Sequence, residues 1–252
     1  MKYFVSCSFG KDSIATALLA VEKGEPIDGL IFCEVMYDHS RNISGEIPEH
    51  IAWIREIAIP RLEEMGLKTI IVRGPRDYIG YFRKTLSRGH NTGKIQGFPL
   101  GGKCVINRDC KVRPIEKYLR GLNEEITQYV GIATDEPIRL ARLKPGRVSL
   151  LAKYGYTEKM AKQLCEKYGL LSPIYKTGTR GGCWFCPNAR IPALCRFRRN
   201  NPELWREFEG LAETPNLCSY GFKYGKTLPE IVAKMDLHDA QMQNTLFPEF
   251  NE

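Results

Sequence analysis

The first half of the chain alternates short apolar runs with longer amphipathic stretches. Apolar runs of strand length lie at residues 3–7, 30–35, 69–72 and 128–132, and helical periodicity lies at residues 13–23 and 48–65. Short apolar strands separated by helices form a parallel sheet that helices cover on both faces. The pattern therefore predicts a Rossmann-like α/β fold, in which a ligand lies at the carboxyl ends of the strands.

Residues 73–102 interrupt this alternation with several glycines and a proline. Their length predicts a long, partly mobile loop, and loops of this length are usually functional or disordered. The segment is either a lid or substrate-contacting arm, or a solvated basic loop, and the sequence leaves both open. Its basic side chains are Arg76, Arg83, Lys84, Arg88 and Lys94.

After residue 133 the pattern becomes mostly helical. Candidate helices lie at residues 157–168, 189–198, 202–212 and 227–235. We therefore expect two domains, an α/β domain over residues 1–150 and a helical region over residues 151–252 that packs on it.

The composition is that of an ordinary globular protein, with 252 residues of which 43% are hydrophobic and 26% charged. The first apolar run turns polar at Ser6, and no window reaches the length of a membrane span. These features predict a cytoplasmic protein with no membrane partner. The net charge of +8 favours a polyanionic partner, although a nucleotide pocket and a solubilising surface also use basic residues.

The segment Ser8-Phe9-Gly10-Lys11-Asp12-Ser13, between the first strand and the first helix, has the features of a phosphate-binding loop. Gly10 lets the backbone approach an anion closely, and the N–H groups that begin the helix have no partners within it, so they point toward that anion. Lys11 adds a mobile positive charge, and the Ser8 and Ser13 hydroxyls add donors. The alternative is an ordinary connection in which Asp12 or Ser13 caps the helix.

The spacing of this loop fits neither a Walker loop nor a dinucleotide fingerprint. It resembles the pyrophosphate loop of the PP-loop ATPases, the adenine nucleotide alpha-hydrolase-like superfamily, whose pattern is Ser-x-Gly-x-Asp-Ser after the first strand. Most members cleave ATP between the α and β phosphates and adenylate a substrate. The resemblance implies that Lys11 and Asp12 are catalytic and that ATP and Mg²⁺ are bound by Ser6, Ser8, Phe9, Gly10, Lys11, Asp12 and Ser13.

A second candidate element follows the fourth strand, where Gly131-Ile132-Ala133-Thr134-Asp135-Glu136 precedes two arginines. Gly131 and Asp135 are candidate nucleotide contacts. If Pro137 begins a helix, Arg139 and Arg142 share a face and are able to clamp one anion as catalytic residues. The stretch partly resembles the Gly-x-Arg-x-x-Glu-Ser stretch of phosphoadenosine phosphosulfate reductases, from which Ala133 and Pro137 depart. The alternative is helix-capping carboxylates with surface arginines.

Four of the nine cysteines form two pairs, Cys104 with Cys110 and Cys183 with Cys186. Both thiolates of a Cys-x-x-Cys turn reach one metal, and two pairs complete a four-sulfur site for zinc or a [4Fe–4S] cluster. The alternatives are four unrelated buried thiols or a redox Cys-x-x-Cys.

The same PP-loop branch contains adenylylsulfate reductases and DNA phosphorothioation sulfur-transfer proteins, which hold a [4Fe–4S] cluster between two such pairs. Residues 108–114 resemble the Arg-Lys-Val-x-Pro stretch of those reductases. The reductases have adjacent cysteines in the first pair, whereas Cys104 and Cys110 are separated by five residues. The resemblance favours iron–sulfur, with zinc as the alternative.

The remaining cysteines and the histidines give weaker signals. Cys195 is a reserve ligand for the four-sulfur site. Cys218 lies in a polar loop and is a candidate reactive thiol. Core packing is expected for Cys7, Cys33 and Cys165, and no metal-ligand spacing relates His39, His50, His90 and His238.

The resemblances imply an ATP-dependent adenylating enzyme, a sulfurtransferase acting on nucleic acid such as tRNA or DNA. ATP would activate an oxygen as its adenylate, and a cluster-bound sulfur would displace AMP, with a cysteine desulfurase as a sulfur donor. The runner-up is a reductase of adenylylsulfate or its 3′-phosphate, although the carboxyl-terminal cysteine of that family is missing here. The third hypothesis is a nucleotide- or nucleic-acid-binding protein without turnover.

Overall fold

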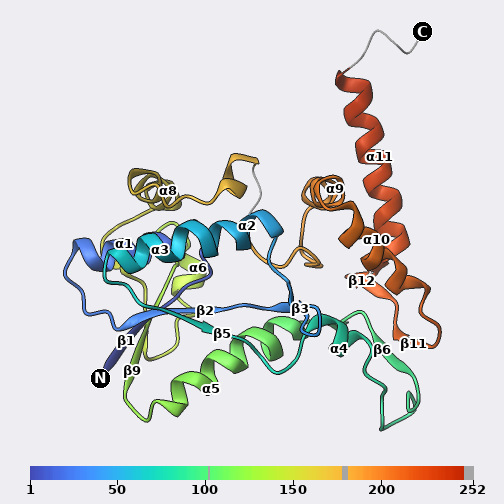
Figure 1. Cartoon of the computed structure of the whole chain (residues 1–252), viewed down its shortest axis with the longest axis horizontal. Helices are drawn as coiled ribbons and strands as arrows, with labels where there is room; N and C mark the ends of the chain where they lie inside the picture. The colour runs from blue at the N-terminus through green and yellow to red at the C-terminus, as the bar shows by residue number, and fades with distance from the viewer. Residues whose placement is uncertain (102, 178–180, 247–252) are drawn as a thin grey trace. The chain divides into compact units, whose positions relative to one another are not determined.

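The computed structural model describes residues 1–101, 103–177 and 181–246 (Figure 1). The chain forms two compact units, each built from three separate segments. Unit 1 comprises Met1–Val35, Glu46–Pro75 and Asp109–Gly182, and unit 2 comprises Met36–Gly45, Arg76–Arg108 and Cys183–Glu252. The predicted division at residue 150 into two consecutive domains stays a prediction.

Unit 1 contains a sheet of five parallel strands in the order β10-β9-β1-β2-β5. This confirms the α/β fold that the alternating pattern predicts. At the centre of the sheet, Val5 pairs with Leu30 on one side and with Tyr129 on the other. The strands are β1 (Lys2–Ser6), β2 (Gly29–Cys33), β5 (Thr69–Val72), β9 (Ile126–Val130) and β10 (Arg147–Val148).

Helices cover both faces of this sheet, with α1 and α3 on one side and α5 on the other (Figure 1). Val5 packs in one hydrophobic cluster with Leu18 of α1, whereas its neighbour Phe4 packs in the opposite cluster with Leu119 of α5. Successive residues of a strand point to opposite faces, so an apolar run is buried on both. The helices are α1 (Lys11–Glu22), α2 (Pro48–Trp53), α3 (Ile59–Glu64), α5 (Arg113–Gly121), α6 (Pro137–Leu140), α7 (Leu150–Lys153) and α8 (Glu158–Lys167), with the 3₁₀ helix η3 (Pro173–Thr177).

The predicted helix at residues 48–65 is a helical segment with a wider turn in its middle. Pro48 begins α2, where a missing N–H needs no partner. Pro60 lies inside the segment, where a proline ring clashes with the preceding turn of an α-helix. A π-helical turn, η1 (Ile54–Ala58), precedes it and relieves that clash. A second π-helical turn, η2 (Asn107–Val112), carries the chain from unit 2 into unit 1.

The order of the strands places a topological switch between β1 and β9. From β1 the chain builds outward through β2 to β5, and it then returns to the other side of β1 to add β9 and β10. Because the connections after β1 and β9 run in opposite directions, they diverge at the carboxyl ends of these strands. Ligands of open α/β sheets bind at such a position.

Unit 2 is mostly helical in its carboxyl-terminal part, as predicted, and it also contains small two-stranded sheets. Its core is aromatic: the Trp184 and Phe197 rings stack at 4.8 Å, and the Tyr78 and Phe185 rings lie 4.3 Å apart. The helices are α4 (Tyr78–Phe82), α9 (Ile191–Asn200), α10 (Pro202–Gly210) and α11 (Leu228–Leu246), with the 3₁₀ helix η4 (Leu211–Glu213). The strands are β3 (Met36–Asp38), β4 (Ile43–Ser44), β6 (Ile95–Gly97), β7 (Leu100–Gly101), β8 (Lys103–Cys104), β11 (Leu217–Ser219), β12 (Gly221–Lys223) and β13 (Lys226–Thr227).

Residues 73–101 are not one irregular loop, so this part of the sequence prediction is wrong. Asp77 caps α4 by accepting a hydrogen bond from the Gly80 N–H at 2.6 Å. Strand β6 pairs in parallel with β11, which lies far away in the sequence. At their junction Gly97 has a φ of 77°, and a Cβ there would lie 2.2 Å from the Ser219 carbonyl oxygen. The glycine that suggests a loop is therefore required by strand pairing.

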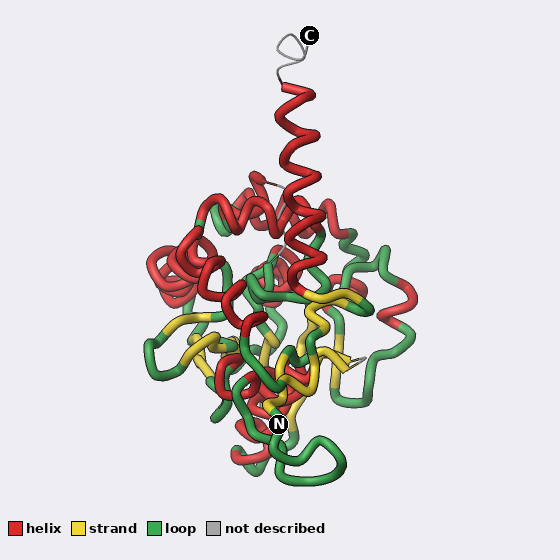
Figure 2. Tube along the Cα trace, turned by 90° about the vertical axis from the view of Figure 1, so that its right-hand side faces the viewer, coloured by secondary structure: helices red, strands yellow, loops and turns green. Residues whose placement is uncertain are grey.

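Helix α11 is the longest helix of the described chain (Figure 2). Its first twelve residues carry the charged side chains Glu230, Lys234, Asp236 and Asp239. Neither α11 nor any other helix in the described ranges is long and apolar enough to cross a membrane.

Candidate functional site

The loop between β1 and α1 is shaped by its backbone and by one buried aromatic side chain. Phe9 has a φ of 55°, in the left-handed region that non-glycine residues rarely adopt. Its ring is 1% exposed and packs edge-on against Phe32 at 5.1 Å. Phe9 therefore anchors the loop in the core, and only its backbone is available to a ligand.

The Ser13 hydroxyl holds the loop closed. It donates a hydrogen bond to the Gly10 carbonyl at 2.9 Å and accepts one from the Ser8 N–H at 3.2 Å. Gly10 occupies the N-cap position, and no side chain caps α1, so the alternative in which Asp12 or Ser13 caps this helix is wrong. Ser6, at the end of β1, lies 3.5 Å from the side-chain nitrogen of Gln128.

Two N–H groups at the start of α1 are available to an anion. Within residues 1–101, 103–177 and 181–246, no acceptor bonds to the N–H of Gly10 or of Asp12. The Lys11 N–H donates to the Tyr175 hydroxyl at 2.9 Å. Free N–H groups at a helix N-terminus favour phosphate or carboxylate oxygens.

Gly131 brings the loop after β9 directly against the first turn of α1. A Cβ on Gly131 would lie 2.7 Å from both the carbonyl carbon of Asp12 and the nitrogen of Ser13. Real Cβ atoms do not approach backbone atoms this closely, so only glycine permits the contact. The structure therefore brings together the two elements that the sequence singled out, at the switch between β1 and β9.

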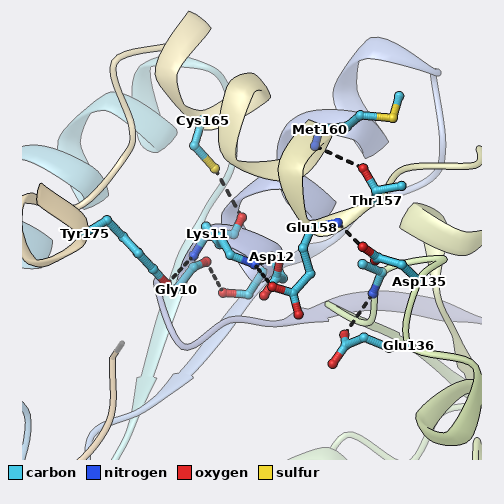
Figure 3. Close-up of polar contacts among 12 residues, drawn as sticks. Gly10, Lys11, Asp12, Asp135, Glu136, Thr157, Glu158, Met160, Cys165 and Tyr175 are labelled. Carbon is cyan, nitrogen blue, oxygen red and sulfur yellow. Dashed lines mark hydrogen bonds and ion pairs between the residues drawn. The ribbon is translucent and has the colours of Figure 1, made fainter. Parts of the chain in front are cut away.

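The charged side chains at this position form a compact network (Figure 3). The Lys11 ammonium group lies 2.7 Å from Asp12 Oδ1 and 3.0 Å from Glu158 Oε2. Burial favours the neutral amine, yet the hydrogen bonds to Asp12 and Glu158 outweigh it and raise the pKa of Lys11. Burial raises the pKa of Asp12, and the nearby Glu158 and Glu136 carboxylates add to that shift.

The loop after β9 contributes two more carboxylates. Asp135 Oδ1 accepts a hydrogen bond from the Glu158 N–H at 3.0 Å, and Glu136 Oε2 accepts one from the Ala133 N–H at 3.1 Å (Figure 3). Asp135 therefore orients the start of α8, while Glu136 closes its own loop. The loop thus places its carboxylates beside the start of α8 and within its own turn.

The two predicted arginines are differently placed. Pro137 begins α6 as predicted, and Arg139 on that helix pairs with Glu136. The helix ends at Leu140, before Arg142, so the prediction that both arginines share a helical face is wrong. The chain leaves the helix there because it turns toward the edge strand β10. Both arginines are exposed, so an anion would have to draw Arg139 from Glu136.

Sequence reasoning missed three residues that contact Lys11. Glu158 begins α8, Cys165 lies on the same helix and donates its S–H to the Lys11 carbonyl at 3.1 Å, and Tyr175 comes from η3. Burial raises the pKa of Cys165 to about 12 and also raises that of Tyr175. The local sequence signals only a helix capped by Thr157, so these contacts follow from the packing of α8 on α1.

The predicted four-sulfur ligands fall in both units. Cys104, Cys183 and Cys186 belong to unit 2 and Cys110 to unit 1. The Cys186 N–H donates to the Cys183 carbonyl at 3.0 Å, which closes the Cys-x-x-Cys turn. Burial raises the pKa of Tyr78, and the neighbouring Tyr37, Cys104 and Cys183 add to the shift, so both thiols lie near this tyrosine.

Trp184 and Lys223 fix the Cys-x-x-Cys turn within unit 2. The Trp184 backbone N–H donates to the Gly45 carbonyl at 2.9 Å, and its ring N–H donates to the Ser44 carbonyl at 3.1 Å. Lys223 donates to the carbonyls of Pro187, at 2.8 Å, and Ala189. Burial lowers the pKa of Lys223, and the nearby Cys186 thiol opposes that shift.

The other cysteines are mostly core residues, as predicted. Cys7, Cys33 and Cys165 are buried, and burial raises the pKa of Cys7 and of Cys33 to about 11. Cys33 donates its S–H to the carbonyl of the equally buried Cys110 at 3.4 Å. Cys218 lies in β11 and is only partly exposed.

Comparisons with known proteins add one distant relative. No family model matches the chain. It is 22% identical over 239 residues to an uncharacterized protein of Methanocaldococcus jannaschii, in an alignment that covers 88% of this chain and 44% of that protein. The chain therefore spans less than half the length of this relative.

Proposed function

We propose that unit 1 binds ATP and transfers its adenylyl group, as the resemblance to PP-loop enzymes implies. The observation that carries this proposal is the close approach of Gly131 to the first turn of α1. A Cβ added to Gly131 would lie 2.7 Å from the backbone nitrogen of Ser13. This contact brings the loop after β9 against the N-terminus of α1, at the switch point of the parallel sheet. Free N–H groups, a mobile lysine and several carboxylates converge there.

Lys11 would move from carboxylates to phosphate during binding. Its ammonium group pairs with Asp12 and with Glu158, whose side chain is 49% exposed. A triphosphate offers several negative oxygens and draws the ammonium group from an exposed carboxylate at little cost, because exposed ion pairs contribute only about 0–1 kcal/mol. The Gly10 and Asp12 N–H groups would then donate to the same phosphate chain.

The carboxylates fit a Mg²⁺ ion that accompanies ATP. Asp12 and Glu158 present oxygens beside the loop, and oxygen ligands on one or two carboxylates plus substrate phosphates are the set that Mg²⁺ takes. Bound Mg²⁺ would neutralise charge that develops on the departing pyrophosphate. Asp12 and Glu158 would hold the ion once Lys11 has moved to the phosphates.

The proposed reaction has two substitution steps. An oxygen of the acceptor attacks the α-phosphorus of ATP, the bond to the β-phosphate oxygen breaks, and pyrophosphate leaves. The acceptor oxygen is then part of an adenylate, which is a good leaving group. A sulfur nucleophile attacks the carbon that bears this oxygen, and AMP leaves with it. Preorganised N–H groups and Lys11 would stabilise the charge of the first step.

The predicted thiolate-bound metal centre remains a proposal for Cys104, Cys110, Cys183 and Cys186. The Cys104 and Cys183 thiols contribute to the raised pKa of Tyr78, and Lys223 places a positive charge near Cys186, which favours a thiolate there. Glycines at 181 and 182 precede the turn and leave room around the sulfur atoms. A [4Fe–4S] cluster bound there would supply a site that accepts sulfide, whereas zinc would supply structural support.

A nucleic acid is the acceptor class that the charge favours. The net charge is +8, and Arg83, Lys84 and Arg88 are exposed on one hairpin of unit 2. The Leu86 N–H donates to the Lys94 carbonyl at 2.9 Å, which holds these residues in a defined turn. Basic side chains on an ordered turn suit a phosphate backbone.

The products formed from ATP test this proposal. The chain, purified anaerobically, is incubated with MgATP and pools of tRNA or DNA, and the proposal predicts AMP and pyrophosphate. Lys11→Met should lower their rate about 100-fold, as loss of a preorganised donor does. Lys162→Met, an exposed lysine of α8, should leave it unchanged. ADP and phosphate as products, or equal rates in the two variants, would contradict the proposal, and sulfite released from adenylylsulfate would favour the reductase.

A further inference from the structure

We propose that Cys195, His238 and Asp239 form a second metal site in unit 2, suited to Zn²⁺. Cys195 lies on α9, and the other two residues lie on α11. The ligand atoms of all three lie within 4.8 Å of one another. No such site was predicted, because nothing in the local sequence relates a cysteine of one helix to a histidine of another.

The size of the cluster fits a single ion. Zinc bonds of about 2.0–2.3 Å to nitrogen, oxygen and sulfur place tetrahedral ligand atoms less than about 4 Å apart. Side chains within 4.8 Å of one another reach that arrangement by small rotations about their own bonds. The packing of α9 against α11 keeps the two helices in place while these side chains rotate, since Cys195 and Met235 are both fully buried.

Two buried polar atoms of this cluster lack hydrogen bonds. Among the described residues, neither His238 Nδ1 nor Asp239 Oδ1 has a hydrogen-bond partner, although both atoms are shielded from solvent. The two atoms lie 3.5 Å apart. Buried polar atoms without partners are rare and costly, and a bound cation would satisfy both at once.

Arg198 leaves one carboxylate oxygen of Asp239 available. Its guanidinium donates to Asp239 Oδ2 at 2.9 Å and to Asp236 Oδ1 at 2.6 Å. A hydrogen bond to one carboxylate oxygen orients the other oxygen toward a metal ion. The charges also balance, because Asp236 offsets Arg198, while a Cys195 thiolate and the Asp239 carboxylate offset a divalent cation.

The donor set selects the metal. A thiolate and an imidazole favour Zn²⁺ over Mg²⁺ or Ca²⁺, which prefer oxygen ligands. Three protein ligands leave a fourth coordination position for water or another ligand. The bound ion would fasten α11 to α9 through side chains of both helices.

Metal stoichiometry tests the site in the full chain. Protein stripped with a chelator is titrated with Zn²⁺ against a chromophoric chelator, and the wild type should bind one more Zn²⁺ per chain than Cys195→Ser or His238→Gln. Arg198→Met should keep the site and weaken it about 10- to 100-fold, as loss of an orienting partner does. Cys218→Ser removes a thiol outside the cluster and should change nothing.

Co²⁺ gives a second, spectroscopic readout, compared among variants whose circular dichroism matches that of the wild type. The thiolate-to-cobalt absorption of the wild type should fall in Cys195→Ser, while Asp239→Asn should retain it with weaker binding. Because the comparison is a difference between variants, metal held by other cysteines cancels. Equal Zn²⁺ stoichiometry and equal Co²⁺ spectra in the wild type and Cys195→Ser would overturn the proposal.

Discussion

The Lys11 ammonium group and the Glu158 carboxylate, separated by 147 residues in the sequence, form an ion pair of 3.0 Å beside the free N–H groups of α1. If the proposed function is right, the pair occupies the place where the charge of the bound phosphates is neutralised. It couples α8 to the loop after β1 and keeps the lysine oriented before any ligand arrives. The pair therefore gives a direct way to perturb the proposed site.

Glu158→Gln should strengthen binding of metal-free ATP by up to about fivefold, because an exposed ion pair of about 0–1 kcal/mol no longer competes for Lys11. With Mg²⁺ present the gain should disappear, since Glu158 is also a proposed ligand of that ion. Isothermal titration calorimetry with and without Mg²⁺ measures both affinities.

The matched control is Glu166→Gln, on the same helix. Glu166 pairs with Lys162 at 3.5 Å, and its side chain is 49% exposed, as that of Glu158 is. Its affinities for ATP should equal those of the wild type. An equal change in ATP affinity in both variants would show a general charge effect and would contradict a specific role of Glu158.

Gly131→Ala should destabilise unit 1 and abolish ATP binding. The added Cβ would lie 2.7 Å from backbone atoms of Asp12 and Ser13, which no side-chain rotation relieves. Overpacking of this kind costs about 1–3 kcal/mol in unfolding free energy. Gly121→Ala, where nothing lies within 4 Å of the new Cβ, should cost nothing measurable in a urea titration. Wild-type ATP affinity in Gly131→Ala would contradict the close approach.

His50 should make stability depend on pH in the weakly acidic range. It is fully buried, its Nδ1 lies 2.8 Å from the Ser172 hydroxyl, and burial lowers its pKa to about 4. The unfolded chain, with an ordinary histidine pKa, takes up the proton first. The contribution of neutral His50 to the unfolding free energy is therefore complete above about pH 6.5. It is lost as the pH falls toward 4, by roughly 3 kcal/mol in total.

His50→Gln keeps a polar partner for Ser172 and removes the titration. Its unfolding free energy should vary less between pH 6.5 and pH 4 than that of the wild type, by up to roughly 3 kcal/mol. His90→Gln replaces an exposed histidine and should reproduce the wild-type curve. Parallel curves for the wild type and His50→Gln would show that folding does not lower the pKa of His50.

Local patterns were sufficient to predict four strands of the parallel sheet and the helices on one of its faces, but not α5 or β10. The run at residues 69–72 coincides with β5, because polar residues and glycines bound this short apolar run on both sides. The run at residues 128–132 differs from β9 (Ile126–Val130), because the apolar pattern continues into the next loop, where Ile132 is also buried. Burial alone therefore does not mark where a strand ends.

The composition of the site could be predicted only where its residues are neighbours in the sequence. Glu158 and Tyr175 meet Lys11 through tertiary packing, so no spacing reveals them. The same reason hides the cluster of Cys195 with His238 and Asp239, which no spacing in the sequence indicates.

Hydrogen–deuterium exchange of the chain with and without MgATP measures whether the two loops bind the nucleotide together. We expect ATP to protect the amides of residues 8–13 and 131–136 together, because both loops border the switch between β1 and β9. Lys11→Met should abolish this protection at the same ATP concentration. Protection confined to other segments, or none at saturating MgATP, would contradict the assignment of an adenine nucleotide site to these loops.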